Sequence, residues 1–400
     1  NDTQPELTGT IDDPAATISV TVNGSTYSAT NNGDGTWTLP EFTITPSLAD
    51  GIYDVAVSAT DAVGNVGSDA TTDELLIDDT GPAVTVDFLA TNDNRPQLTG
   101  TIDDPTALLN VTVGGNAYSA TNNGDGTWTL ADDAITAPLA DGLYNVSVVS
   151  IDPYTNLGVD GTTNELLIDT TAPVVTVNPR ATNDTTPELT GTVDDPAAVI
   201  NVTVNGTGYA ATNNGDGTWT LADNTIGPAL ADGIYEVIVT ATDAVGNVGS
   251  DASSNELDID ATPPVVTVDT LVTNDNRPEL TGTVDDPTAL ISVVVNSANY
   301  FATNNGDGTW TLADNTLPVL ADGIYNVSVA ATDSYGNFGV DATTGELDID
   351  ATAPVVTVNA LATNDTTPEL TGTVDDPTAS VSVTVDSVLY FATNNGDGTW

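Results

Sequence analysis

The 400-residue sequence contains no cysteine, no histidine, no methionine and only three basic residues, all of them arginine. The lack of cysteine and histidine excludes disulfides, thiol catalysis, zinc sites and histidine acid–base catalysis. The lack of basic residues, at a net charge of −55, excludes nucleic acid as a direct partner, because phosphate contacts need Lys and Arg. No apolar run is long enough to cross a bilayer, so we expect no membrane insertion.

One eight-residue stretch returns letter for letter along the chain. Thr-Asn-Asn-Gly-Asp-Gly-Thr-Trp occupies Thr30–Trp37, Thr121–Trp128, Thr212–Trp219, Thr303–Trp310 and Thr393–Trp400, so the tryptophans are 91, 91, 91 and 90 residues apart. A fixed period of this kind indicates a tandem array. Each copy predicts a β-hairpin, because alternating residues flank a five-residue Gly/Asn/Asp turn. We expect the Trp to point into a core and the turn itself to be structural.

Alternating apolar and polar residues continue through each repeat, and no helical period appears. The predicted strands of the first repeat and the start of the second lie near Glu6–Ile11, Ile18–Val22, Tyr27–Leu39 (a hairpin), Tyr53–Thr60, Leu75–Ile77 and Pro82–Phe88. Seven short strands per repeat favour an all-β fold, a tandem array of immunoglobulin-like seven-stranded β-sandwich modules that forms an extended rod. Tyr53, Tyr144, Tyr235 and Tyr325 stand where such folds often carry a corner tyrosine, although half-buried core positions would suit them equally.

The period predicts three complete repeats and two partial ones. We expect a first repeat at 1–78, then repeats at 79–169, 170–260 and 261–350, and a last one at 351–400. The chain starts and stops inside a repeat, with no initiator Met and no signal peptide. We therefore expect it to be an excerpt from a longer array.

Strand alternation assigns the loops to the two ends of each sandwich. The end where a repeat begins receives the acidic-pair loop (Asp12-Asp13-Pro14 and its equivalents), the Asn/Gly turn (Asn31–Gly35) and the Asp/Asn loop (Asp61–Asn65). The opposite end receives the Ala-Asp-Gly turn (Ala49–Gly51) and the loop Ala90–Arg95. Repeats are joined by connectors as short as Asp78–Pro82, and a linker that short with proline at its end should be stiff.

Each junction gathers carboxylates from the connector, the acidic-pair loop and the Asp/Asn loop. Bare carboxylates so close together would repel one another, and oxygen ligands in loops are what Ca²⁺ takes. We therefore predict an inter-repeat Ca²⁺ site, against the alternative that these are ordinary turns. The candidate ligands are Asp12, Asp13, Asp61 and Asn65 in the first repeat; Asp78, Asp79, Asp103, Asp104, Asp152 and Asn156 at the first junction; Asp169, Asp194, Asp195, Asp243 and Asn247 at the second; Asp260, Asp285, Asp286, Asp333 and Asn337 at the third; and Asp350, Asp375 and Asp376 at the fourth.

Three further sets of residues were weighed for a role. The aspartates of the Asn/Gly turns (Asp34, Asp125, Asp216 and Asp307) are weaker metal candidates. The arginines Arg95, Arg180 and Arg277 lie at or beside the Ala90–Arg95 type of loop and could pair with junction carboxylates. Carboxylate pairs such as Asp103 and Asp104 could suggest a glycosidase, but they are adjacent in sequence and no insertion forms a cleft, so we expect no enzyme.

Four segments resemble the bacterial immunoglobulin-like repeats of giant RTX and biofilm-associated surface adhesins: Asp169–Val177, Thr182–Pro196, Ala231–Tyr235 and Ala241–Asn247. The resemblance covers the whole chain. It implies export by type I secretion to the bacterial cell surface and a stalk, stiffened by Ca²⁺ between repeats, that carries terminal ligand-binding domains. The second repeat departs from the pattern, because Asp152-Pro-Tyr-Thr-Asn156 lacks the glycine of the other Asp/Asn loops.

The sequence therefore predicts a structural extender for cell adhesion or biofilm formation, whose partners are Ca²⁺ and the neighbouring repeats. Two alternatives stay open. The repeats could themselves bind a glycan, although we expect most aromatic residues to face inward. They could also associate laterally with one another as a sheath or surface layer.

Overall fold

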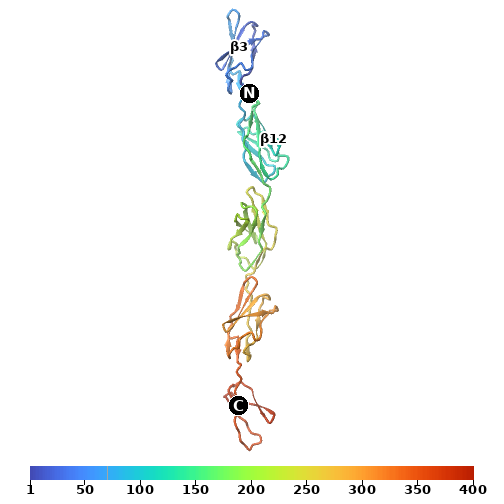
Figure 1. Ribbon diagram of the computed structural model, residues 1–400, viewed down its shortest axis with the longest axis vertical. Helices are drawn as coiled ribbons and strands as arrows, with labels where there is room; N and C mark the ends of the chain where they lie inside the picture. Colours follow the sequence, from blue (N-terminus) through green and yellow to red (C-terminus); the bar gives the residue numbers. More distant parts are fainter. Residues whose placement is uncertain (70) are drawn as a thin grey trace.

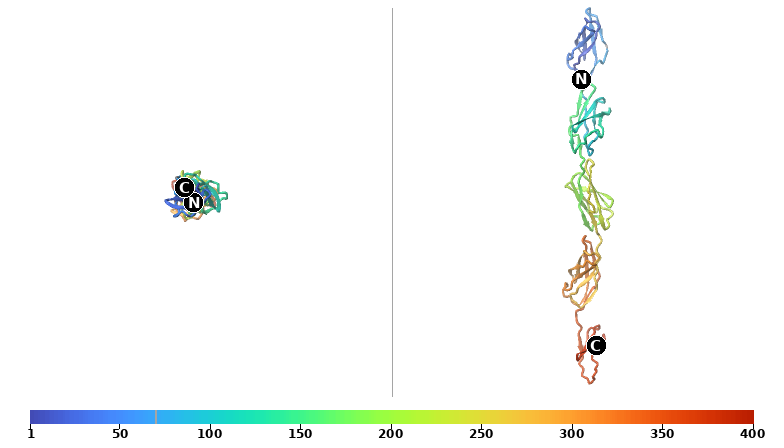
Figure 2. Two further views of the ribbon diagram at one scale, coloured as in Figure 1. Left: turned by 90° about the horizontal axis from the view of Figure 1, so that it is seen from above. Right: turned by 90° about the vertical axis from the view of Figure 1, so that its right-hand side faces the viewer.

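The repeats follow one another end to end and form an extended rod (Figure 1). Seen down the long axis they superimpose within one small outline, and seen from the side they stand in single file (Figure 2). This is a computed structural model, and it describes residues 1–69 and 71–400. The regular structure in those ranges is entirely β, which confirms the predicted fold class. Within the same ranges, no helix is long and apolar enough to span a bilayer.

The strands recur in the same order in every repeat. The first repeat contains β1 (Leu7–Thr10), β2 (Thr17–Val22), β3 (Ser25–Asn31), β4 (Thr36–Leu39), β5 (Gly51–Tyr53), β6 (Val55–Thr60), β7 (Val66–Ser68) and β8 (Leu75–Ile77). The second contains β9 (Leu89–Thr91), β10 (Leu98–Thr101), β11 (Leu108–Val113), β12 (Asn116–Asn122), β13 (Thr127–Leu130), β14 (Gly142–Tyr144), β15 (Ser147–Ile151), β16 (Leu157–Val159) and β17 (Leu166–Ile168).

The third repeat has the fullest set of strands. It contains β18 (Val175–Val177), β19 (Arg180–Thr182), β20 (Leu189–Val193), β21 (Val199–Val204), β22 (Thr207–Asn213), β23 (Thr218–Leu221), β24 (Gly233–Tyr235), β25 (Val237–Thr242), β26 (Val248–Ser250) and β27 (Leu257–Ile259). The fourth contains β28 (Leu271–Thr273), β29 (Leu280–Thr283), β30 (Leu290–Val295), β31 (Ala298–Asn304), β32 (Thr309–Leu312), β33 (Gly323–Tyr325), β34 (Val327–Thr332), β35 (Phe338–Asp341) and β36 (Leu347–Ile349), and the fifth contains β37 (Val356–Val358), β38 (Gly372–Val374), β39 (Val381–Val385) and β40 (Val388–Ala392).

The third repeat shows how these strands build a sandwich. Its larger sheet has the order β18-β20-β23-β22-β21-β25-β26. Strand β22 pairs with β21 over its first five residues and with β23 over its last two, so it passes from one half of the sandwich to the other. A small sheet, β19-β27-β24, completes the structure, and β19 runs parallel to β27.

Three of the seven predicted strands are divided in two. The predicted strand Tyr53–Thr60 is β5 and β6, which pair with different partners, β8 and β2. The last strand of each sandwich has an additional half, exemplified by β7, that pairs with β6. The first strand of each complete sandwich likewise has a second half, exemplified by β9, which pairs parallel to β17. The last residues of β9 belong to the Ala90–Arg95 segment, which was predicted as a loop.

The Trp of each hairpin is the largest side chain in its core, as predicted. Trp128, Trp219 and Trp310 are fully buried. The indole Nε1 of Trp219 donates a hydrogen bond to the Thr176 carbonyl at 2.8 Å. The indole lies against Gly191, where an added Cβ would be 2.5 Å from Nε1 and 1.9 Å from that carbonyl oxygen. The Leu-Thr-Gly-Thr strand therefore needs glycine at this position.

The corner tyrosine also has the predicted form. The hydroxyl of Tyr235 donates to the Ala231 carbonyl at 2.9 Å, four residues upstream, and Tyr53, Tyr144 and Tyr325 do the same in their repeats. Each buried hydrophobic cluster consists of residues from one predicted repeat only. The apolar cores are thus separate, and polar loops lie between them.

Candidate functional site

The Asp/Asn loop of each later repeat contacts the connector that precedes it. The Asn247 side-chain amide donates to the Asp169 carbonyl at 2.8 Å. Asn156 makes the same bond to Asp78 at 2.9 Å, and Asn337 makes it to Asp260 at 2.7 Å. These asparagines were predicted as metal ligands through their oxygens, and the structure shows that their amide nitrogens join one repeat to the next.

The aspartate of the same loop organises the loop itself. Asp243 accepts hydrogen bonds from the Asn247 backbone at 2.8 Å and from the Asn247 side chain at 2.7 Å. Burial acts to raise the pKa of Asp243, but the hydrogen bonds from Asn247 outweigh it and hold the pKa below its ordinary value. Asp152 and Asp333 behave alike. In the second repeat, Thr155 takes the place of the loop glycine with a φ of 73°, so the loop shape survives at the cost of backbone strain.

The two aspartates of the acidic-pair loop have different structural roles. Its first aspartate caps the start of the repeat: Asp194 accepts from the Val174 backbone at 2.8 Å, and Asp103, Asp285 and Asp375 accept from the equivalent residues. Its second aspartate closes its own turn, as Asp195 does by accepting from the Ala197 backbone at 2.8 Å. Asp13, Asp104, Asp286 and Asp376 act in the same way. Asp12 forms no side-chain hydrogen bond with the described residues.

At the third junction the predicted ligands line one cavity. Asp260, Asp285, Asp286 and Asp333 surround a space of about 280 Å³ together with Thr262, Pro263 and Pro264. Oxygen donors from three loops suit a hard cation such as Ca²⁺. However, among residues 1–69 and 71–400 no three acidic side chains converge closely enough to hold a metal ion. The structure therefore places suitable oxygen donors around one cavity, but their side chains are too far apart to coordinate a single ion.

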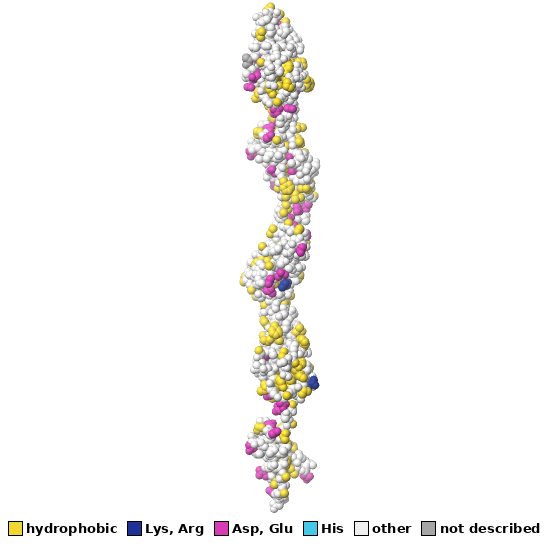
Figure 3. Space-filling view, turned by 60° about the vertical axis from the view of Figure 1, so that its left-hand side comes forward, with side chains coloured by type: hydrophobic (Ala, Val, Ile, Leu, Met, Phe, Trp, Pro, Cys, Tyr) yellow, Lys and Arg dark blue, Asp and Glu magenta, His cyan; other side chains and the backbone are white. Residues whose placement is uncertain are grey.

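The same groups recur at the other junctions. The connector aspartates Asp78, Asp169 and Asp350 cap the residue two positions on, as Asp169 does by accepting from the Thr171 backbone at 3.1 Å. Asp79 contributes only its backbone N–H to the contacts seen here. In the space-filling view, acidic side chains lie at several of the narrow waists between repeats (Figure 3).

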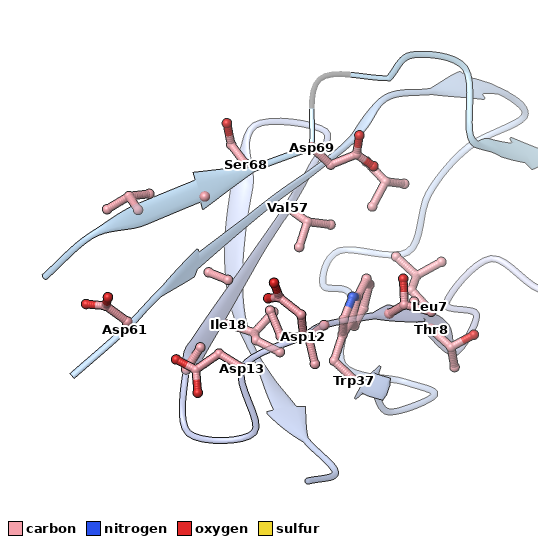
Figure 4. Close-up of a pocket in the computed structure, with 18 of the residues that line it drawn as sticks. Leu7, Thr8, Asp12, Asp13, Ile18, Trp37, Val57, Asp61, Ser68 and Asp69 are labelled. Carbon is pink, nitrogen blue, oxygen red and sulfur yellow. The ribbon is translucent and has the colours of Figure 1, made fainter. Parts of the chain in front are cut away.

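The first repeat serves as a comparison, because the described residues include no connector in front of its loops. Asp12, Asp13, Asp61 and Asn65 line an open cavity of about 790 Å³ that reaches down to Trp37 (Figure 4). Asn65 of its Asp/Asn loop is exposed, whereas the equivalent residues Asn156 and Asn337 are 7% exposed. The connector, which these later asparagines contact, thus covers this loop.

The Ala-Asp-Gly turn is a junction element that the sequence reasoning missed. Asp232 accepts a hydrogen bond from the Ala261 backbone at 2.7 Å, and the Thr262 hydroxyl also donates to it. Asp50, Asp141 and Asp322 hold their connectors in the same way. The connector hydroxyl is the main cause of the lowered pKa of each of these aspartates. The only sequence signal for this role is the recurrence of Ala-Asp-Gly in successive repeats, because a single Asp-Gly pair indicates no more than a turn.

One contact is specific to the third junction. The Tyr335 hydroxyl of the fourth repeat donates to the Asp258 carboxylate of the third at 2.6 Å. This bond to Asp258 is the main reason that the pKa of Tyr335 is raised. The sequence analysis missed the pair, because the two residues are far apart in the chain and each looks like a surface position.

A buried glutamate was also missed. Glu256 is 3% exposed and accepts from the Val237 backbone at 2.9 Å, where β24 gives way to β25. Glu165 and Glu346 are equivalent, and the second oxygen of all three has no partner among the described residues. These buried glutamates bond to the backbone where the chain leaves the small sheet and enters the larger one, so we assign them a structural role.

The remaining candidates stay within their own repeats. Asp34 and its equivalents close the Asn/Gly turn, as when Asp34 accepts from the Thr36 hydroxyl at 2.6 Å. Arg95 pairs with Asp133 of its own repeat at 3.0 Å. Arg277 donates to the Leu317 carbonyl at 2.8 Å, which is likewise internal. Pairing of arginine with junction carboxylates is therefore not seen in the described residues.

The comparisons with solved structures include segments of large adhesins. The chain is 28% identical to a tetra-tandem repeat from the extending region of a large adhesion protein, covering 88% of this chain and 97% of that one at a TM-score of 0.39. It is 21% identical to a Ca²⁺-stabilized adhesin that helps an Antarctic bacterium bind ice, covering 86% and 94% at a TM-score of 0.36. It is 19% identical to part of a 1.5-MDa bacterial ice-binding adhesin, covering 68% and 100% at a TM-score of 0.32. No curated protein matches the sequence.

The comparison with protein families gives a match along nearly the whole chain. The family described as "Bacterial Ig-like domain" matches residues 1–79, 70–170, 175–261 and 266–351. These matches recur at the period of the Trp hairpins, and each contains one corner tyrosine and one buried core. The chain therefore belongs to the bacterial Ig-like domain family, as a tandem array of its repeats.

Proposed function

We propose that the chain is a stalk segment of a large bacterial surface adhesin, which holds ligand-binding domains at a distance from the cell. The observation that carries this proposal is that the first three connectors are held from both sides. The Ala-Asp-Gly turn of one repeat and the Asp/Asn loop of the next both bond to the connector, as Asp141 and Asn247 do around Asp169 and Thr170. The repeats that meet at these connectors are therefore joined closely, which would keep the array extended.

We propose the repeat boundaries 79–169, 170–260 and 261–350 for the three complete units. They place each buried cluster within one unit. Export by type I secretion, a place on the cell surface and a part in biofilm formation belong to the same proposal. They rest on the family resemblance and on the extending region of a large adhesion protein to which the chain is similar.

We further propose that Ca²⁺ stiffens the junctions. The four carboxylates around the third-junction cavity are hard oxygen donors. Without a cation they repel one another at short range, so an ion would draw them together. The ligands would come from the connector, the acidic-pair loop and the Asp/Asn loop, with Asp260, Asp285, Asp286 and Asp333 holding the ion at this junction.

Small-angle scattering of residues 1–400, with Ca²⁺ and with a chelator, tests the role of the ion. Chelation should shorten the maximum dimension and leave the circular dichroism of the strands nearly unchanged, because the apolar cores contain no metal. Added salt should restore the dimension only partly, since screening weakens repulsion without supplying ligand bonds. A maximum dimension that chelation leaves unchanged would assign the stiffness to the hydrogen bonds and proline alone.

A matched pair of variants tests the ligands. Asp169→Ala with Asp243→Ala should place one hinge between the second and third repeats. Asp223→Ala with Glu236→Ala removes the same charge from exposed positions of the third repeat outside the proposed ligand set, and it should leave the scattering profile as it was. Equal profiles for the two pairs would show that the ligands are wrong.

Exposed aromatic residues favour a second function, binding of a glycan by the repeats themselves. The expectation that aromatic residues face inward is right for the tryptophans, but all five phenylalanines are exposed: Phe42, Phe88, Phe301, Phe338 and Phe391. Aromatic side chains at the surface can stack on sugar rings. A glycan array probed with residues 1–400 would detect this, and binding that is lost in Phe301→Ser would support it.

A further inference from the structure

The charge of this protein is unevenly placed on its surface. In each of the first four repeats, four neighbouring strands form one outer face: β2, β3, β6 and β7 in the first, for example, and β30, β31, β34 and β35 in the fourth. None of the outward-facing residues of these strands is charged, in any of the four repeats. We call this surface the neutral face. The acidic residues lie instead in the loops and on the small sheet, except Asp341, which ends β35 on its inward side.

The neutral face differs between repeats in how apolar it is. One row across the fourth repeat reads Phe301, Ser292, Ala330, Val340, and Phe301 and Val340 are 81% and 55% exposed. The same row of the first repeat reads Ser28, Ser19, Ser58, Ser68. In the space-filling view, hydrophobic side chains gather over the fourth repeat (Figure 3). The chain therefore contains a strongly apolar and a purely hydroxyl version of this one row of the neutral face.

We propose that the neutral face is where a second copy of this chain docks side by side. At a net charge of −55, two copies that meet through their loops bring carboxylates together, which opposes contact. The neutral face is a surface on which two copies can meet without that repulsion. Exposed side chains such as Phe301 and Val340 lose water on contact, which favours association. The inference depends neither on the stalk role nor on calcium.

The size of the face indicates how the contact must work. Four strands at about 4.8 Å spacing, with about five residues each, offer roughly 300 Å² per repeat. A stable interface needs about 800 Å² from each partner. One repeat is therefore too small, and contacts must add along the array. A second copy is the partner that repeats at the same interval, and on this face that favours it over the glycan considered above.

Sedimentation velocity of residues 1–400 in Ca²⁺, from about 10 to about 500 μM, tests the proposal. The wild type should show weak, reversible, concentration-dependent association that strengthens with added NaCl, because salt screens the remaining carboxylates. Phe301→Ser with Val340→Ser should weaken the association by about tenfold. This pair installs the residues found at Ser28 and Ser68, which the same fold already carries. The reverse pair, Ser28→Phe with Ser68→Val, should strengthen the association and decides the matter if the first pair fails to fold.

Two results would overturn the inference. A wild type that stays monomeric throughout this range would exclude a second copy as the partner, and binding of such a monomer to a glycan array would assign the face to sugar instead. Association that both variant pairs leave unchanged would place the contact elsewhere on the rod.

Discussion

Truncation of one buried tryptophan tests how each repeat is held together. Trp219→Ala removes a fully buried indole from the third repeat and leaves a large cavity. It also removes the donor to the Thr176 carbonyl, so one strand of the sandwich loses its tie to the hairpin. Gly191, which lies against the indole, has no side chain that could move into the space.

The expected cost follows from these losses. Truncation of a buried large aromatic residue to alanine costs about 3–5 kcal/mol, including the cavity. For a unit of 60–100 residues each kcal/mol lowers the melting temperature by about 4–8 °C. The third repeat should therefore melt roughly 12–40 °C below its wild-type temperature. The melting temperature of Trp219→Phe should lie between those of the wild type and Trp219→Ala, because phenylalanine keeps most of the volume but lacks the N–H donor.

Differential scanning calorimetry of residues 1–400 measures this directly. One transition should move to lower temperature, while the transitions of the repeats that contain Trp128 and Trp310 stay nearly in place. Val199→Ala is the matched control, because that side chain is 71% exposed in the same repeat and its loss should change the unfolding free energy by less than about 0.5 kcal/mol.

Two results would refute the reasoning. A loss of less than about 1 kcal/mol for Trp219→Ala would show that the indole does not support the core as a buried aromatic residue must. Displacement of every transition by the same amount would show that the repeats unfold as one unit, and the proposed boundaries would then be wrong.

Three further predictions concern single contacts. Tyr335→Phe should loosen only the third junction, because one hydrogen bond across it is lost, and the distribution of fluorescence energy transfer across that junction should broaden while the distribution across the second junction does not. In chelator, the rod should lose stiffness as the pH falls below about 3.9, because the pKa values of Asp141, Asp232 and Asp322 are lowered chiefly by hydrogen bonds from threonine hydroxyls. The stabilisation from these carboxylates is complete above their unfolded-state pKa and is lost as the pH falls through their lower folded-state pKa. An equal maximum dimension at pH 6 and pH 3 would contradict this. Thr155→Gly should raise the melting temperature of the second repeat, because it relieves a left-handed φ of 73° that costs a non-glycine residue about 1–2 kcal/mol, and an unchanged or lower melting temperature would show that the loop pays no such strain.

The sequence indicated the features that rest on local pattern. The period, the hairpins, the inward tryptophans and the corner tyrosines all follow from residue spacing and alternation, and the structure confirms them. The loops also lie at the predicted ends, since Asn213 of the Asn/Gly turn bonds to the Asp195 carbonyl of the acidic-pair loop.

The additional half of the last strand has no recognisable sequence pattern, and the reason is how it packs. In β26 the inward residue is Gly249, flanked by the exposed residues Val248 and Ser250. A Cβ at Gly249 would lie 1.7 Å from the Pro173 carbonyl oxygen, so the close approach of the repeat's first residues requires glycine there. The apolar alternation that marks other strands is thereby removed. Long-range partners such as Tyr335 and Asp258 leave no local pattern at all.

The contacts that hold the connector have a consequence for how such a gene can change. Asn156, Asn247 and Asn337 bind a main-chain carbonyl, and the Ala-Asp-Gly turns bind a main-chain N–H. The N–H comes from Asp79, Thr170, Ala261 or Ala351, so the side chain there varies without loss of the bond. Every residue has these backbone groups except the N–H of proline, so these bonds do not depend on which residue the next repeat begins with. Repeats can therefore be added to or removed from the array while the backbone bonds of each new junction still form.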